Sequence, residues 1–221
     1  MAMTKGSAPR WRACSPEGAL CGLDEAGRGP LAGPVCAAAV ILPEGFPLEL
    51  LEDSKKLSPA ARERAREALY GSGALWGIGW VSAAEIDAIN IHHASLLAMR
   101  RAFLVMAADP RCAALLAPPA GGPSTGIPSS DGRITAIADG RFAPELPVAC
   151  RALVKADAQI PEVMAASIIA KTARDRVMER YSWLYPEYGY EQHKGYPTKL
   201  HYERIARFGP SPIQRMSFRW N

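Results

Sequence analysis

Long hydrophobic runs are missing from this 221-residue sequence. The longest apolar stretches, such as residues 35–42, are far shorter than the roughly 20 residues that a membrane-spanning helix needs. The first twenty residues are basic but contain no apolar core, which argues against a secretory signal. The composition is still 48% apolar, so we expect a chain that buries a sizeable core.

Paired cysteine motifs are also missing. The five cysteines are scattered, and no two of them form a C-x-x-C pair. An odd, unpatterned set argues against a disulfide framework and against a zinc site. We therefore expect a protein of the reducing cytoplasm.

No strong charge of one sign marks the whole chain, whose formal net charge is +4. The charge is unevenly distributed, because residues 151–221 hold 12 Lys and Arg against 7 Asp and Glu. A basic C-terminal third is typical of a protein that binds a polyanion. A solvated basic surface would give the same pattern, and charge alone leaves the two readings open.

Short β-like apolar runs alternate with helical patterns along the chain. The first two runs flank a Gly- and Pro-rich connection and predict a hairpin. Ser58 and Pro59 have the residue types of a helix N-cap and first turn. Strands are expected at residues 20–23, 35–42, 74–81, 134–138 and 148–154, and helices at 59–70, just after Ser82, and at 93–107, 161–184 and 199–208. This order predicts an α/β fold with a mixed sheet.

The chain shows no linker that would divide it into two domains. We expect a flexible lead over residues 1–19 and a single domain over residues 20–221. Residues 118–130 are almost wholly Pro, Gly, Ala, Ser and Thr, which predicts a mobile insertion of unassigned role.

Four acidic residues stand at or just beyond the ends of apolar runs: Asp24, Glu25, Asp139 and Asp157. Ligand sites of open α/β sheets lie beyond strand ends, so these carboxylates could meet in space. Close carboxylates repel one another, and Mg²⁺ or Mn²⁺ would neutralise them. Any one of them could instead cap a helix or close a turn. Neighbouring strand residues face opposite sides, so Asp24 and Glu25 share a site only if the strand ends or bulges there.

Other residues have both a functional and a structural interpretation. The turn Gly27-Arg28-Gly29 could present backbone N–H groups to a ligand, or could simply be a tight turn. Lys55 and Lys56 could hold phosphates or be solvated. Tyr196 could stack on a base or sugar, or pack internally. His193 could be a ligand or proton carrier, although a packed histidine is the commoner case.

Taken together, these segments closely resemble the bacterial-type ribonuclease HII family. The signature segments are residues 22–35 (GLDEAGRGPLAGPV), 53–57 (DSKKL), 138–140 (ADG), 155–157 (KAD), 165–171 (AASIIAK) with Arg174-Asp175, and 193–198 (HKGYPT). They follow the family's order and span roughly residues 20–200. The first segment is long and highly specific.

The resemblance implies a ribonuclease H-like mixed sheet flanked by helices, with a helical C-terminal extension from about residue 185. It implies that Asp24, Glu25, Asp139 and Asp157 bind two Mg²⁺ or Mn²⁺ ions. It also implies that the Gly27-Arg28-Gly29 backbone senses the 2′-OH beside the scissile phosphate and that Tyr196 lies against the nucleic acid. The 2′-OH is the group that distinguishes RNA from DNA.

The activity implied is hydrolysis of the RNA strand of RNA–DNA hybrids and nicking of DNA 5′ of a single embedded ribonucleotide. Two-metal chemistry would leave 5′-phosphate and 3′-hydroxyl ends, with Asp24 shared between the ions. Lys55, Lys56 and Lys171 are expected to hold neighbouring phosphates, with Arg28 as a further candidate. Nothing in the sequence demands more than a monomer.

Three features depart from the family pattern. The stretch around residues 118–130 is longer than the family connection, and Ala156 stands where glycine is frequent. Residues 214–218 (QRMSF) are less basic than the equivalent stretch of relatives, which puts the tail's contribution to nucleic-acid affinity in doubt.

Two other functions remain open. A DNA resolvase, integrase or transposase could share the acids, and cleavage of an all-DNA duplex would reveal it. A non-catalytic hybrid-binding module is the second, and metal-dependent turnover would exclude it. Four carboxylates without metal would only repel a phosphate backbone.

Overall fold

A mixed five-stranded sheet forms the centre of the computed structural model, which describes residues 18–51, 57–116 and 134–219. The strand order is β3-β2-β1-β4-β5. Strand β1 pairs antiparallel with β2 and parallel with β4, so the expected hairpin and the mixed sheet are both confirmed. The strands are β1 (Ala19–Ala26), β2 (Val35–Ile41), β3 (Leu75–Val81), β4 (Ile134–Asp139) and β5 (Ala149–Leu153).

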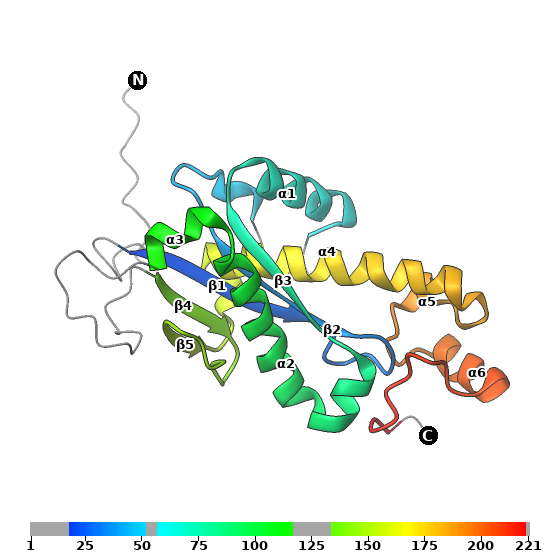
Figure 1. Cartoon of the computed structure of the whole chain (residues 1–221). Helices are drawn as coiled ribbons and strands as arrows, with labels where there is room; N and C mark the ends of the chain where they lie inside the picture. The colour runs from blue at the N-terminus through cyan, green and yellow to red at the C-terminus, as the bar shows by residue number, and fades with distance from the viewer. Residues whose placement is uncertain (1–17, 52–56, 117–133, 220–221) are drawn as a thin grey trace.

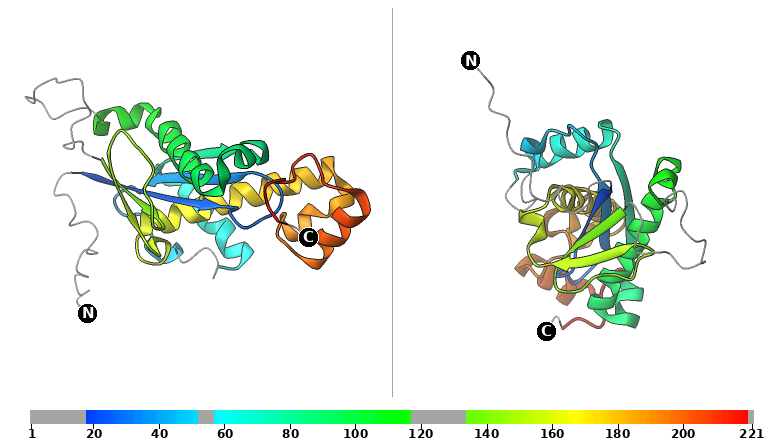
Figure 2. Two further views of the ribbon diagram at one scale, coloured as in Figure 1. Left: turned by 90° about the horizontal axis from the view of Figure 1, so that it is seen from below. Right: turned by 90° about the vertical axis from the view of Figure 1, so that its left-hand side faces the viewer.

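Helices cover both faces of the sheet (Figures 1 and 2). Helices α2 (Ala83–Ala107) and α3 (Pro110–Leu116) pack on one face, and α1 (Pro59–Gly71) and α4 (Pro161–Leu184) pack on the other. Strand alternation divides the core accordingly. Ala37 and Ala39 of β2 face α2, whereas Cys36, Ala38 and Val40 face α1 and α4.

The C-terminal region is helical, as expected, and it lies beside the end of α4 (Figure 1). It contains a 3₁₀ turn at Pro186–Tyr188, then α5 (Tyr190–His193) and α6 (Lys199–Phe208). Tyr188, Tyr190 and Ile213 pack with Met178 of α4 in a small core of their own. The segment after α6 returns to the connection between β1 and β2, where Gln214 forms an isolated β-bridge with Ala32.

Helix α2 agrees with the expectation of two helices in this region. Its residues 83–107 comprise two helical halves joined across a kink at Asn90, whose backbone is not helical (φ 64°, ψ 164°). The Asn90 side chain accepts hydrogen bonds from the N–H groups of His92 and His93, which caps the second half locally. Helix α3 was not predicted, and the stretch at residues 118–130 and most of the lead lie outside the described residues.

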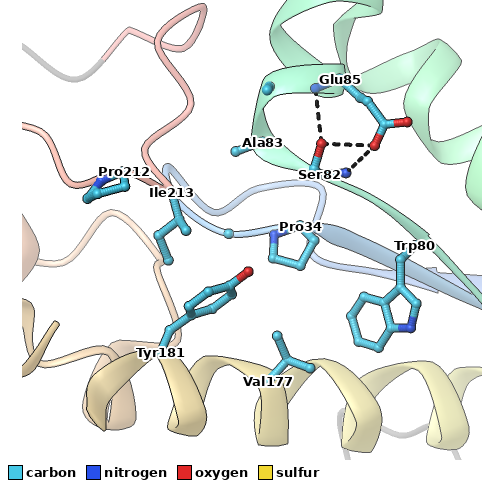
Figure 3. A pocket seen from close by; sticks show the side chains of 11 residues that line it. Pro34, Trp80, Ser82, Ala83, Glu85, Val177, Tyr181, Pro212 and Ile213 are labelled. Atoms are coloured by element: carbon cyan, nitrogen blue, oxygen red, sulfur yellow. Dashed lines mark hydrogen bonds between the residues drawn. The ribbon is translucent and has the colours of Figure 1, made fainter. Parts of the chain in front are cut away.

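Ser82 begins α2 through a reciprocal capping box with Glu85 (Figure 3). The Glu85 N–H donates to Ser82 Oγ at 3.3 Å, and the Ser82 N–H donates to Glu85 Oε2 at 2.8 Å. We expect Ser82→Ala to lower the free energy of unfolding by about 1 kcal/mol, because one helix N–H loses its acceptor. Denaturant unfolding measures this. Ser82→Asp keeps an acceptor and should retain most of the stability, and an equal loss in both variants would contradict the capping role.

Within the described ranges, no helix has the length and apolar character needed to cross a bilayer.

Candidate active site

Asp24 and Asp139 lie at equivalent positions on two neighbouring parallel strands. Leu23 of β1 is in register with Ala138 of β4, and the two acids are the next residue on each strand. Leu23 and Ala138 belong to the core beneath α2, so alternation directs both acids toward α4. There Asp24 is buried and hydrogen-bonds with Ser167 of α4. The sheet therefore brings these two carboxylates to the same face, at the carboxyl ends of β1 and β4.

Asp157 reaches the same edge through the turn that follows β5. Lys155 is left-handed (φ 60°), and the chain then enters a 3₁₀ turn at Ala156–Ala158. The Ala156 N–H donates to Asp139 Oδ1 at 2.7 Å, which ties this turn to the end of β4. Asp157 is the next residue and is buried. Asp139 thus helps to fix the segment that carries Asp157.

Glu25 projects to the opposite face of the sheet. It is in register with Ala37, which belongs to the core beneath α2, and β1 ends one residue later at Ala26. Its carboxylate pairs with the Arg28 guanidinium at 3.3 Å. The structure therefore places Glu25 beside Asp24 along the chain but not on the same side of the strand.

The acids influence one another's ionisation. Burial raises the pKa of Asp24 well above its usual value, and the neighbouring charges of Glu25 and Asp139 raise it further. Burial also raises the pKa of Glu25, against the opposing effect of Arg28. This edge of the sheet thus concentrates negative charge that the protein only partly compensates.

Hard divalent cations suit such a donor set, because carboxylate oxygens are their preferred ligands and their charge would relieve the repulsion. Across the described ranges, no three Asp, Glu, His or Cys side chains converge into a ready-made metal cage. The fit of a cation to this edge therefore rests on donor chemistry and uncompensated charge.

The Gly27-Arg28-Gly29 turn follows β1 directly. Gly27 has φ 95°, and a Cβ there would lie 2.0 Å from Nε of Arg174, so no larger residue fits. Arg28 and Gly29 are exposed. The turn therefore offers its backbone to solvent next to Asp24 and Glu25.

Tyr196 borders this turn. Its ring atom Cε1 would lie 3.7 Å from a Cβ at Gly29, and its side chain is 39% exposed. The Leu31 N–H donates to the Gly195 carbonyl at 2.8 Å, which joins the two segments. Lys171 of α4 lies 6.0 Å from the Tyr196 ring and is paired with Asp175 at 2.8 Å. Lys55 and Lys56 lie outside the described residues.

The ribonuclease HII family model matches residues 21–114 and 130–220. The chain belongs to the ribonuclease HII family. It is 52% identical over 206 residues to the ribonuclease HII of Treponema denticola, an alignment that covers 90% of this chain and 97% of the relative. The family assignment makes the chain an endoribonuclease of the ribonuclease H type, which cleaves the RNA of RNA–DNA hybrids.

Solved structures agree on the fold. The ribonuclease H2 of Pyrococcus horikoshii superposes with a TM-score of 0.60 at 23% identity, covering 91% of this chain and 94% of that one. Bst-RNase HIII in complex with Mn²⁺ also gives 0.60, at 19% identity, covering 91% of this chain and 67% of that one. At these identities the likeness supports the ribonuclease H-like fold alone.

A cavity of about 370 Å³ lies apart from the acids of this ribonuclease HII family member (Figure 3). Trp80, Val177, Tyr181 and Ile213 line it, between the start of α2, α4 and the C-terminal segment. None of the four acids is among its lining residues. The candidate active site is therefore the group of strand ends that carries the acids, and not this pocket.

Sequence reasoning gave no role to two arginines that contact the turn. Arg174 and Arg215 are buried, and their guanidinium groups donate to backbone carbonyls between Gly27 and Pro34. Arg174 stands within a signature segment and Arg215 within the tail, but no spacing rule links either one to the turn. His193, left open from sequence, is buried and bonds the Tyr188 carbonyl through Nε2.

Proposed function

We propose that Asp24, Glu25, Asp139 and Asp157 hold two Mg²⁺ or Mn²⁺ ions, with Asp24 shared between them. The supporting observation is that Asp24 and Asp139 end neighbouring strands on one face, with Asp157 tied to Asp139 through the Ala156 N–H. Glu25 lies next to Asp24 near the end of β1 and would have to turn from the opposite face to join them. Bound divalent ions supply electrostatic stabilisation of the phosphate and of the attacking and leaving oxygens. This proposal assigns the family's cleavage of RNA–DNA hybrids to these four residues.

The chain's own residues would select and orient the substrate. The backbone N–H groups of the exposed residues Arg28 and Gly29 would hydrogen-bond a ribose 2′-OH, the group that marks RNA. Tyr196, next to Gly29, offers an aromatic face to the same nucleotide. Lys171, whose Nζ lies 6.0 Å from the Tyr196 ring centroid, would contact a neighbouring phosphate after leaving Asp175. Lys55 and Lys56 stay candidates for further phosphate contacts.

We further propose that cleavage occurs 5′ of a single ribonucleotide in duplex DNA, leaving 5′-phosphate and 3′-hydroxyl ends. Such nicking would begin the removal of ribonucleotides from DNA during replication and repair. We expect the chain to do this in the cytoplasm as a monomer.

The test is an end-labelled DNA duplex with one central ribonucleotide, incubated with Mg²⁺, with Mn²⁺ and with EDTA. We expect metal-dependent nicking 5′ of the ribonucleotide, while an all-DNA duplex stays intact because it lacks the 2′-OH. Cleavage of both duplexes would favour a DNA nuclease of related fold. Cleavage of long hybrids alone would contradict the single-ribonucleotide proposal.

A further inference from the structure

Arg215 binds backbone carbonyl groups in the Gly27-Arg28-Gly29 turn and in the residues that follow it. Its side chain has no exposed surface, and it comes from the C-terminal segment, 188 residues after Gly27. The guanidinium donates to the carbonyls of Gly27 at 2.6 Å, Arg28 at 3.0 Å, Pro30 at 2.8 Å and Gly33 at 2.9 Å. One side chain thus binds four carbonyls of residues 27–33, the stretch that follows Asp24 and Glu25.

The surroundings of Arg215 make the burial of its charge energetically unfavourable. Burial, and then the neighbouring charge of Arg174, lower the pKa of Arg215 to about 9. The guanidinium hydrogen bonds described for it all go to neutral carbonyl oxygens. Burying a cation among neutral partners costs free energy, which the fold must supply elsewhere. What the fold gains at this position is a fixed direction for each carbonyl.

That direction determines where the N–H groups of the turn point. Across a planar trans peptide, the carbonyl of one residue and the N–H of the next lie on opposite sides. The Gly27 and Arg28 carbonyls point inward to Arg215, so the Arg28 and Gly29 N–H groups point away from it. Both residues are exposed. Arg215 therefore directs two backbone donors toward the side from which a nucleic acid would approach.

Arg174 joins this turn to the loop that carries Tyr196. Its guanidinium donates to the Pro34 carbonyl at 3.0 Å, the Ala32 carbonyl at 3.1 Å and the Lys194 carbonyl at 3.0 Å. Its stem fills the space that a Gly27 side chain would occupy, and its Cζ lies 5.9 Å from the Tyr196 ring centroid. A single arginine thus contacts both segments and sets the distance between them.

We propose that Arg215 and Arg174 are positioning residues for ribonucleotide recognition. They hold the Arg28 and Gly29 N–H groups outward, at a fixed place relative to Tyr196, and so determine how strongly the protein prefers a ribonucleotide to a deoxyribonucleotide. This inference rests on the proposed function of the turn. It adds that the preference depends on two side chains that never touch the substrate.

Asp87 of α2 provides a way to test the arrangement without touching a buried cation. Its carboxylate accepts hydrogen bonds from the Met216 and Ser217 N–H groups, both at 2.9 Å, directly after Arg215. Ser217 Oγ donates to the same carboxylate at 2.6 Å. Removing these bonds should loosen the segment that carries Arg215 while the folded core is preserved.

The experiment compares wild type with Arg215→Lys, Arg174→Lys and Asp87→Ala. Binding in EDTA is measured by fluorescence anisotropy for a duplex with one ribonucleotide and for the matched all-DNA duplex, and cleavage of the former gives kcat and KM. Lysine keeps the charge, but one ammonium cannot span the carbonyls that a guanidinium reaches. We expect roughly a tenfold or larger fall in kcat/KM. A shift of about 1 Å in the groups that position a substrate can lower the rate by more than tenfold. Affinity for the all-DNA duplex should be unchanged.

Arg101→Lys is the matched control, since Arg101 donates to the Trp80 carbonyl and pairs with Glu85 away from the turn. It should keep the wild-type preference. General loosening of the fold would weaken binding of both duplexes in proportion, and that result would overturn the inference, as would an unchanged preference in folded Arg215→Lys or Arg174→Lys. If both lysine variants unfold, a wild-type preference in folded Asp87→Ala would overturn it instead. A wild-type protein that binds the two duplexes equally would overturn the proposed function as well.

Discussion

Asp24→Asn is expected to lower turnover at least about a thousandfold while leaving the fold intact. The amide keeps the shape of the side chain and the oxygen that accepts the Glu25 N–H at 2.7 Å. It removes the negative charge that interacts with those of Glu25 and Asp139, and with it the carboxylate proposed to be shared by two ions. Steady-state cleavage of a duplex with one ribonucleotide, in saturating Mg²⁺, measures the effect.

The same variant should be at least as stable as wild type in EDTA. Because burial and Glu25 raise the pKa of Asp24 in the folded state, ionisation of Asp24 disfavours folding. Wild type therefore loses stability as the pH rises above the usual carboxyl value of 3.8 toward the raised pKa, and the asparagine variant lacks this loss. Asp109→Asn, which alters a partly exposed carboxylate paired with Arg111 far from the acids in sequence, is the matched control for activity. Near-wild-type turnover in Asp24→Asn would refute the assignment of the acids.

Gly79→Ala is expected to lower the free energy of unfolding by about 3 kcal/mol. A Cβ on Gly79 of β3 would lie 2.1 Å from the Ala98 carbonyl oxygen and 2.5 Å from the Ala102 backbone nitrogen, both in α2. These are backbone atoms, so the helix as a whole must move away from the sheet. Urea unfolding should show a lower midpoint at an unchanged slope.

Gly71→Ala is the matched control for Gly79→Ala. Gly71 is the last residue of α1, and a Cβ there meets no atom within 4 Å. Alanine restricts the unfolded chain and suits a helix better, so this variant should gain about 0.5–1 kcal/mol. Opposite signs for the two substitutions are the expected result. A neutral Gly79→Ala would mean that α2 can shift on the sheet at little cost.

The positions of the acids could be predicted from sequence because they depend on local patterns. Each apolar run signals a strand, and an acid at its end falls at the sheet edge wherever the strand lies. Asp139 and Asp157 follow this rule, and the structure brings their segments together through the Ala156 N–H. The opposite facing of Asp24 and Glu25 also follows from strand alternation.

Other features depend on long-range packing that no local pattern encodes. The two halves of α2 meet end to end at the Asn90 kink because both pack on the same face of the sheet, where Ile86 and Ala94 share one core. The roles of Arg174 and Arg215 depend on carbonyls about 140 to 188 residues away in the chain. Periodicity cannot register such contacts, since an arginine in a helix or tail looks solvent-exposed by default.

The order of synthesis determines when the Arg215 contacts can form. The Gly27-Arg28-Gly29 turn leaves the ribosome early, but the donors for its carbonyls are made 188 residues later. Until that segment emerges, the turn lacks the partners that fix its shape, and buried carbonyls without donors are unfavourable. Strand pairing can proceed during translation, whereas this turn reaches its native conformation only once Arg215 has been synthesised. A chain truncated before Arg215 would thus carry all four acids and still present a turn without its native geometry.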